Sequence, residues 1–410
     1  MNKKASIYNL FAVGIKVLSG PLVYFLMATK FDSFILVAYF FILAINNLRT
    51  IFEGGVTNII KRKYITYEKK ELENLSTFSY YWFFMIAFIL FIVSIILGGL
   101  YAEYVLNNFN SIIMPLALAS FASSLRVRML YMDAYVDGFV SSSDYRRSIF
   151  LSSIMSTIAL IIAIEYDFKL YSIFISQIVQ VIVIYFSLRK DMNNFRISDK
   201  QSFKIFKKEY QKSMKLIKST VKTWSVGYLF WNSTILIVPV FFEKEISSKI
   251  LFTYSLFKSI YDLAASVFMA NIPLITNKIK TKRDDLLATL VKISIISSFL
   301  YLFGSIFLII VIYLNIIEAL NSKFLGFYDS IYIVILFFII LLKTIIHNFV
   351  RCFEVEPFFY FILYNAIVML ISPIIIYYFN FNFFLPHSLF LLPMIYYSIL
   401  ELKYRLKRVN

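Results

Sequence analysis

The sequence predicts an all-α polytopic membrane protein: about twelve transmembrane helices in two six-helix lobes around a central cavity, with both termini in the cytoplasm. The first reason is composition, because 60% of the 410 residues are hydrophobic and only 16% are charged, whereas a soluble domain is roughly 45–50% apolar and about 25% charged. The second is that the apolar residues form runs of about 20, the length that crosses a bilayer. The third is that basic residues concentrate in alternate connections between these runs, as they do in cytoplasmic loops.

Twelve runs are long and apolar enough to be spans. The first follows two lysines but lacks a small-residue cleavage pattern, so we expect a retained helix and not a signal peptide. The chain then divides into an N-terminal lobe (1–188), a cytoplasmic linker (189–218) and a C-terminal lobe (219–410). The spans of the first lobe are expected at about 7–29, 33–55, 76–99, 110–134, 148–165 and 170–188. Those of the second are expected at about 219–241, 249–274, 290–316, 328–350, 357–379 and 386–402.

The linker is the least hydrophobic stretch of the chain, with ten Lys or Arg residues against Asp191, Asp199 and Glu209. Ser198 and Gln201 form a capping box before a run in which apolar residues recur every three or four positions. This run predicts a basic amphipathic helix on the inner membrane surface, with its aromatic side chains at the acyl boundary and its lysines on anionic headgroups. A merely solvated linker is the alternative. The apolar positions are Phe203, Phe206, Tyr210, Met214 and Ile217.

The distribution of basic residues predicts the orientation of the spans. The asymmetry between the two sides places both termini in the cytoplasm. The outer connections are short, which leaves no outer domain to host catalysis. Besides the linker, the cytoplasmic segments hold Lys3, Lys4, Lys61, Arg62, Lys63, Lys69, Lys70, Arg146, Arg147, Lys278, Lys280, Lys282, Arg283, Lys403, Arg405, Lys407 and Arg408. The opposite side holds Lys30, Lys169, Lys244, Lys249 and Lys323, diluted by acidic residues.

Ionisable side chains within the spans are the strongest functional signal, because charge at membrane depth is costly and usually faces a cavity or a partner. Lys16, Lys258 and Lys343 lie deep in their spans, where the side chain cannot easily reach the interface, so we expect them to face a cavity. Arg49 and Lys222 lie in the inner parts of their spans. These cations outnumber unpaired acids, which suits a cavity that receives an anionic group, such as a pyrophosphate, from the cytoplasmic leaflet.

Two alternatives apply to these charges. Glu53 follows Arg49 by four residues and Asp262 follows Lys258 by four, so each pair can neutralise itself on one helix face. Cations near the inner ends of spans are expected to extend their side chains to the membrane interface instead. Those cations are Arg126, Arg128, Lys222 and Arg351.

Polar uncharged residues within the spans, such as Asn232 and Asn348, and the abundant aromatic residues suit the passage of a glycan. The chain has 30 Tyr and 45 Phe residues. Aromatic faces with amide and hydroxyl donors often hold sugars, although most of these rings must face lipid, packing or the interfacial belts.

Other functions lack the residues they need. The net charge of +17 follows from basic cytoplasmic loops, so nucleic-acid binding is not expected. One cysteine and two histidines do not supply a Cys/His metal site. No phosphate-binding GxxxxGK[ST] loop and no plausible Ser/His/Asp or Cys/His set occurs. We therefore expect no catalytic residues, no metal and no cofactor.

The chain resembles the polysaccharide and O-antigen flippases of the Wzx type, within the multidrug/oligosaccharidyl-lipid/polysaccharide exporter superfamily. Two six-span lobes, cytoplasmic termini and a basic central loop carry the resemblance over the full length. The local signal lies in the first lobe, in Asn9-Leu10, Gly14 and Pro21 and in the run from Phe52 to Arg62. Here Glu-Gly-Gly stands where a member of the family carries Asp-x-Gly.

The resemblance implies a lipid flippase that works by alternating access. Its substrate would be an undecaprenyl-pyrophosphate-linked oligosaccharide, an O-antigen or capsule repeat unit, moved from the inner to the outer leaflet of the bacterial cytoplasmic (inner) membrane for lipopolysaccharide biosynthesis or polysaccharide export. The other partners would be membrane lipids, a coupling ion (H⁺ or Na⁺) and the glycan polymerase and chain-length machinery. The expected pyrophosphate-binding cations are Lys16, Arg49, Lys222, Lys258 and Lys343, supported by Glu53, Asp262, Asn232 and Asn348.

Three other functions remain open from the sequence. A drug or small-molecule antiporter would have the same fold, but buried positive charge disfavours cationic substrates. A membrane glycan polymerase or ligase would tend to carry a sizeable outer loop with catalytic Arg or His residues, which the short outer connections do not offer. A channel or scaffold without transport activity is the last alternative.

Overall fold

The computed structural model is helical throughout its described residues and contains no β-strand among them, which confirms the predicted all-α class. The residues described are Gly20, 22–53, 55–67, 69–197, 202–281, 285–314, 322–353 and 358–406. Eleven helical segments in these ranges are long and apolar enough to cross a membrane, and each coincides with one predicted span. Most of the remaining predicted span, 7–29, lies outside the described residues, but residues 22–30 are helical.

The described chain separates into two compact units. Unit 1 runs from Ala38 to Leu229, and unit 2 combines the segment up to Val37 with everything from Phe230 onward. Two helices cross from one unit to the other, α2 (Ser33–Asn46) near the start of the chain and α10 (Ser202–Phe241) in its middle.

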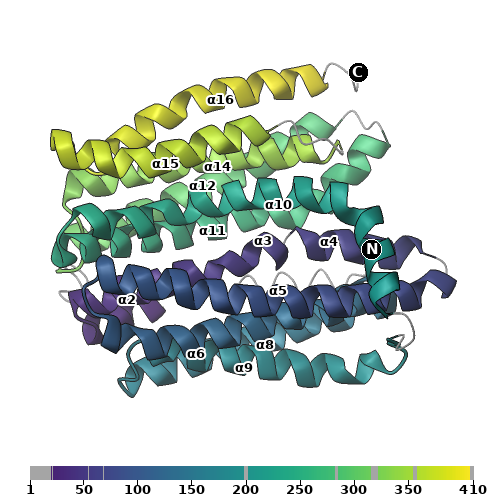
Figure 1. Cartoon of the computed structure of the whole chain (residues 1–410). Coiled ribbons are helices and arrows are strands. Elements are labelled where there is room, and N and C mark those ends of the chain that lie inside the picture. The colour runs from purple at the N-terminus through teal and green to yellow at the C-terminus, as the bar shows by residue number, and fades with distance from the viewer. Residues whose placement is uncertain are drawn as a thin grey trace. The chain divides into compact units, whose positions relative to one another are not determined.

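Unit 1 is built on four long helices. α5 packs along α6, α6 along α9, and α8 along α9 (Figure 1). Ser141 begins α8 as its N-cap, because its hydroxyl accepts the Asp144 N–H at 3.3 Å and so satisfies one free donor of the first turn. The helices are α5 (Lys69–Tyr104), α6 (Phe109–Arg128), α8 (Ser142–Glu165) and α9 (Tyr171–Leu188), which is followed by a 3₁₀ turn, η3 (Arg189–Met192).

Two predicted spans of unit 1 are interrupted and extend further than expected. The second passes from α2 through a 3₁₀ turn, η1 (Asn47–Arg49), and α3 (Thr50–Glu53) to α4 (Val56–Thr66). The fourth passes from α6 through α7 (Leu130–Tyr135) to a π-helical turn, η2 (Val136–Val140). The irregular turns bring α4 against α7 and η2.

The predicted linker helix and the seventh span form one helix, α10, because 203–219 contains neither Gly nor Pro to end a helix. The expectation that its aromatic residues lie at the acyl boundary is wrong for Phe206 and Tyr210. The Phe206 ring lies 5.4 Å from Phe78 and the Tyr210 ring 5.8 Å from Trp82, both on α5. The Phe206 and Tyr210 side chains therefore pack on protein, whereas Phe203 is exposed. The proposed capping residues Ser198 and Gln201 lie outside the described residues.

A buried carboxylate fixes the same segment of α10. Glu209 is only 2% exposed and lies 2.8 Å from the Lys212 ammonium group and 3.7 Å from that of Lys63 on α4. The Tyr67 hydroxyl donates to it at 3.3 Å. The basic segment is thus joined to α4 by its one buried acid, while most of its lysines remain exposed.

Unit 2 contains the remaining long helices. α11 packs along α12 and α14, and α14 along α16, which in turn contacts α15 (Figure 1). The segment before α2 belongs to the same unit: the Tyr24 ring meets Phe252 of α11 edge-on at 5.8 Å, and Asp32 caps α2 by accepting the Ile35 N–H at 2.8 Å. The helices are α11 (Lys244–Lys280), α12 (Leu286–Tyr313), α14 (Phe327–Arg351), α15 (Phe359–Phe379) and α16 (Leu385–Leu406).

Gly138 marks a close approach of η2 to α4. A Cβ atom added here would lie 2.9 Å from the Lys61 carbonyl oxygen and 3.0 Å from the Tyr64 Cβ. Both neighbours belong to α4, so η2 contacts α4 without room for a side chain. The ion pair between Lys61 and Asp137 lies beside this contact.

We predict that Gly138→Ala destabilises the protein, because overpacking typically costs about 1–3 kcal/mol. The melting temperature of the purified protein in detergent should fall by several degrees, measured by circular dichroism. Gly227→Ala is the matched control, because nothing lies within 4 Å of a Cβ added there and alanine favours a helix more than glycine does. Equal melting temperatures for Gly138→Ala and the wild type would contradict the proposed close contact.

Candidate functional site

Two of the predicted cavity cations, Lys258 and Lys343, share one aromatic cluster in unit 2. Its centre is the Phe230–Trp231 pair of α10, whose rings lie 4.8 Å apart at 74°. The Lys343 ammonium group lies 4.3 Å from the centre of the Phe230 ring, and that of Lys258 lies 5.0 Å from the Trp231 ring. A cation over an aromatic face is attracted by the electron density of the ring. Helices α11 and α14 thus deliver two cations to adjacent rings.

Lys343 is the more buried of the two cations. The residue is only 7% exposed. Within the described part of the chain, Lys343 forms no ion pair and no hydrogen bond, and its ammonium group lies over the Phe230 ring. Charged groups that are buried in proteins are normally paired with opposite charge. An ammonium group without an acidic partner among the described residues therefore keeps its capacity to bind an anion.

Lys258 has two partners on different helices. Its ammonium group pairs with Asp262, one turn later on α11, at 2.7 Å, and it also faces Trp231 on α10. Lys258 and Asp262 therefore neutralise each other on one face of α11, as the alternative based on their four-residue spacing predicted. The side chains remain partly accessible, 31% for Lys258 and 52% for Asp262.

A second layer of contacts holds the helices that carry the lysines. The Tyr261 hydroxyl lies 3.0 Å from that of Thr344, which joins α11 to α14 next to Lys343. The Tyr261 ring also lies 5.3 Å from Trp231 and 5.7 Å from Phe337. Tyr261 thus contacts all three helices of the cluster and fixes the spacing between its two cations.

The two predicted supporting amides lie in unit 2 as well. Asn232 follows Trp231 and is 3% exposed. Asn348 lies just over one turn beyond Lys343 on α14, where it accepts from Arg351 at 3.3 Å and donates to the sulfur of Met269 at 3.4 Å. The side chain of Asn348 is therefore already engaged with its neighbours.

Arg49 and Glu53 belong to a different network, in unit 1. Glu53 lies 3.6 Å from Arg49 and 3.5 Å from Arg126, and Arg126 pairs with Asp133 at 2.5 Å. The interpretation that Arg126 extends to the membrane interface is wrong, because Arg126 is 3% and Asp133 2% exposed. The break between α6 and α7 turns Asp133 back toward the arginine seven residues earlier. This network is balanced, with two cations and two anions.

The other predicted cations have separate positions. Arg128 stacks on Tyr80, with its guanidinium carbon 3.9 Å from the ring centre. Lys222 lies on an exposed face of α10 within unit 1. Lys16 lies outside the described residues.

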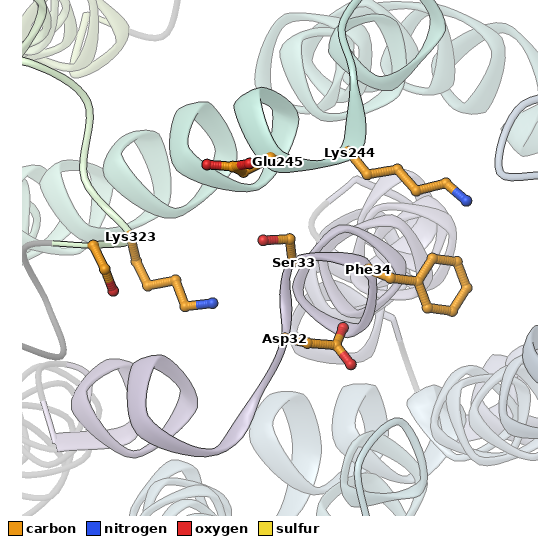
Figure 2. Close-up of a pocket in the computed structure, with 7 residues that line it drawn as sticks. Asp32, Ser33, Phe34, Lys244, Glu245 and Lys323 are labelled. Atoms are coloured by element: carbon orange, nitrogen blue, oxygen red, sulfur yellow. The ribbon is translucent and has the colours of Figure 1, made fainter.

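A separate open pocket of about 600 Å³ lies at one end of unit 2 (Figure 2). The start of α2, the start of α11 and the segment before α14 line it. The predicted orientation would place all three of these segments on the outer side of the membrane. The lining residues are Asp32, Ser33, Phe34, Lys244, Glu245, Ser322 and Lys323.

Sequence reasoning located the two lysines of the cluster but missed its rings. Phe230, Trp231 and Tyr261 resemble every other aromatic residue in a chain that is 19% aromatic. One local signal existed: Tyr261 lies three residues after Lys258, so both project from the same face of α11. The partnership of Lys343 with Phe230 spans more than a hundred residues and left no local pattern.

No protein-family model matches the sequence, and no curated protein matches it. Solved structures do match. The lipid II flippase MurJ in an inward closed conformation is similar with a TM-score of 0.73 at 16% identity, over 98% of this chain and 87% of that one. An outward-facing multidrug resistance MATE family transporter of the MOP superfamily gives 0.57 at 11%, over 99% and 94%. A MOP superfamily transporter from Pyrococcus furiosus, described as having a binding pocket of reverse polarity, gives 0.55 at 11%, over 99% and 94%.

These similarities cover nearly the whole chain, and the named structures are described as a flippase and as transporters. The chain has the fold shared by the lipid II flippase and the transporters of the MOP superfamily.

Proposed function

We propose that this chain flips an undecaprenyl-pyrophosphate-linked oligosaccharide, an O-antigen or capsule repeat unit, from the inner to the outer leaflet of a bacterial cytoplasmic membrane. The observation that carries the proposal is Lys343, a buried cation without an acidic partner among the described residues. Its neighbour in the aromatic cluster, Lys258, adds a second cation. The pyrophosphate carries negative charge, so it is the part of this substrate that is most costly to move through a membrane. The two lysines of the cluster can compensate that charge.

The chemistry required of the site is binding and release, with no covalent step. Two ammonium groups donate charge-assisted hydrogen bonds to phosphate oxygens, and such bonds are roughly twice as strong as neutral ones. The rings beneath them hold the cations in place by attraction that does not neutralise them. In an alternating-access cycle, the same groups face each side of the membrane in turn.

The remaining predicted site residues stay part of this proposal. Lys16, Arg49 and Lys222, with Glu53, would contribute from the first lobe, and Asn232 and Asn348 would add amide groups in the second. A coupling ion (H⁺ or Na⁺), the glycan polymerase and the chain-length machinery complete the proposed set of partners. The predicted organisation, with lobes at 1–188 and 219–410 joined by a cytoplasmic linker, is likewise retained.

A drug antiporter is the second candidate, because multidrug MATE transporters share the fold. The aromatic cluster argues against it, since its two lysines repel the cationic compounds that such exporters commonly carry. Energised efflux of a cationic dye from vesicles would favour the antiporter. Accumulation of lipid-linked glycan on the inner leaflet of a deletion strain would favour the flippase.

We predict that Lys343→Met slows flipping of the lipid-linked oligosaccharide by roughly tenfold or more, because a hydrogen bond to a charged group is worth about 1.5–3 kcal/mol. Methionine fills a similar volume without charge. The rate would be measured in proteoliposomes that contain the purified protein. Lys292→Met is the matched control, since Lys292 is an exposed lysine on the neighbouring helix α12. A wild-type rate for Lys343→Met would remove this residue from the site.

We predict opposite reporter activities for fusions on the two sides of the last span of the first lobe. Alkaline phosphatase, which is active only outside the cytoplasm, should be active when fused after Asp167 and inactive when fused after Arg196. The excess of basic residues in the linker is the physical reason. The same activity at both positions would contradict the proposed orientation.

A further inference from the structure

Asp262 lies where it competes with any anion for Lys258. Its carboxylate is 2.7 Å from the Lys258 ammonium group and is 52% exposed. An anionic group that reaches Lys258 must therefore share the ammonium group with this carboxylate or displace it. Lys343, the other cation of the aromatic cluster, has no such competitor among the described residues. Before an anion binds, Lys258 therefore has an acidic partner, whereas Lys343 has none among the described residues.

The order of Lys258 and Asp262 along α11 makes their ion pair weaker than one in which the acid comes first. In a helix, an acidic residue placed four positions before a lysine stabilises the pair more than the reverse order does, because of the helix dipole. Lys258–Asp262 has the reverse order, whereas Glu245–Lys249 on the same helix, at 2.9 Å, has the favourable one. A partly exposed pair of this type contributes at most about 1 kcal/mol, which a pyrophosphate can overcome.

Lys258 also keeps a partner when the carboxylate leaves. The Trp231 ring, 5.0 Å from its ammonium group, belongs to α10 and does not move with Asp262. Displacement of the carboxylate therefore leaves Lys258 positioned over a ring, in the same environment that Lys343 already has over Phe230. Because Trp231 holds the Lys258 ammonium group, a pyrophosphate can replace the Asp262 carboxylate while Lys258 stays in place.

The charges of the site support the exchange. A pyrophosphate diester carries one negative charge on each phosphorus, which the two lysines balance. Asp262 adds a third negative charge next to the bound diester, and like charges that lie close together repel. The carboxylate thus weakens binding by competition before the substrate arrives and by repulsion afterwards.

We propose that Asp262 is an internal competitor: it occupies Lys258 in the empty site, is displaced by the pyrophosphate of the substrate, and returns to Lys258 to promote release. The proposal rests on the proposed function and adds a positioning residue that sets how tightly the anion is held. A transporter that bound its substrate too tightly would not release it, so a built-in competing carboxylate favours turnover.

The test is the affinity of the purified full-length chain in nanodiscs for farnesyl-pyrophosphoryl N-acetylglucosamine, a short-chain pyrophosphate diester, measured by isothermal titration calorimetry. Asp262→Asn should bind about two- to fivefold more tightly than the wild type, given that a partly exposed ion pair is worth at most about 1 kcal/mol. Asp262→Glu, which preserves the charge, should bind like the wild type. A gain in affinity distinguishes competition from structural damage, because damage lowers affinity.

Glu245→Gln provides the matched control. It removes the acid of the other Lys/acid pair on α11, away from the aromatic cluster, and should leave the affinity unchanged. Equal affinities of the wild type and Asp262→Asn would overturn the role of Asp262 while leaving the proposed function intact. Absence of pyrophosphate binding by both would overturn the two proposals together.

Discussion

The cost of placing charge at membrane depth determines how this chain arranges its polar residues. An ionised group in a medium of low dielectric constant needs a partner, and this chain provides both acids and aromatic rings. In unit 1, Arg126 has Asp133 and Glu53, and Lys63 has Glu209. In unit 2, Lys258 has both Asp262 and the Trp231 ring, whereas Lys343 has the Phe230 ring and no acid among the described residues. A cation paired with an acid is neutralised, whereas a cation held by a ring alone still lacks a counter-charge.

This difference separates structural charges from those available to a ligand. Removing one member of a buried ion pair is strongly destabilising, because it leaves the other charge uncompensated. Arg126 and Asp133 accordingly fix the bend between α6 and α7 and have little capacity for a further anion. A ring attracts a cation through its quadrupole and contributes no opposite charge, so the Phe230 ring leaves the charge of Lys343 uncompensated. Burial alone would not have distinguished these two residues, since both Arg126 and Lys343 are largely inaccessible.

The parts of the structure that depend on local patterns were predictable from the sequence. Long apolar runs located eleven spans, and a spacing of four residues identified the pairs Arg49–Glu53 and Lys258–Asp262. Contacts between distant residues were not predictable: Arg126 was misassigned because its acidic partners depend on the fold around the break after α6. The packing of Phe206 on Phe78 was missed for the same reason, since an amphipathic face that packs on protein has the same sequence pattern as one that lies on lipid. Phe230 and Trp231 could not be singled out among so many aromatic residues.

The segment that precedes α2 has a consequence for biosynthesis. Tyr24 leaves the ribosome before its partner Phe252 on α11, which follows more than two hundred residues later. At a translation rate of about 5–20 residues per second, the first segment waits on the order of ten seconds or more for the helix against which it packs. Such an early apolar helix must remain in the lipid without its native neighbour during this interval, so membrane insertion and the completion of unit 2 are separated in time.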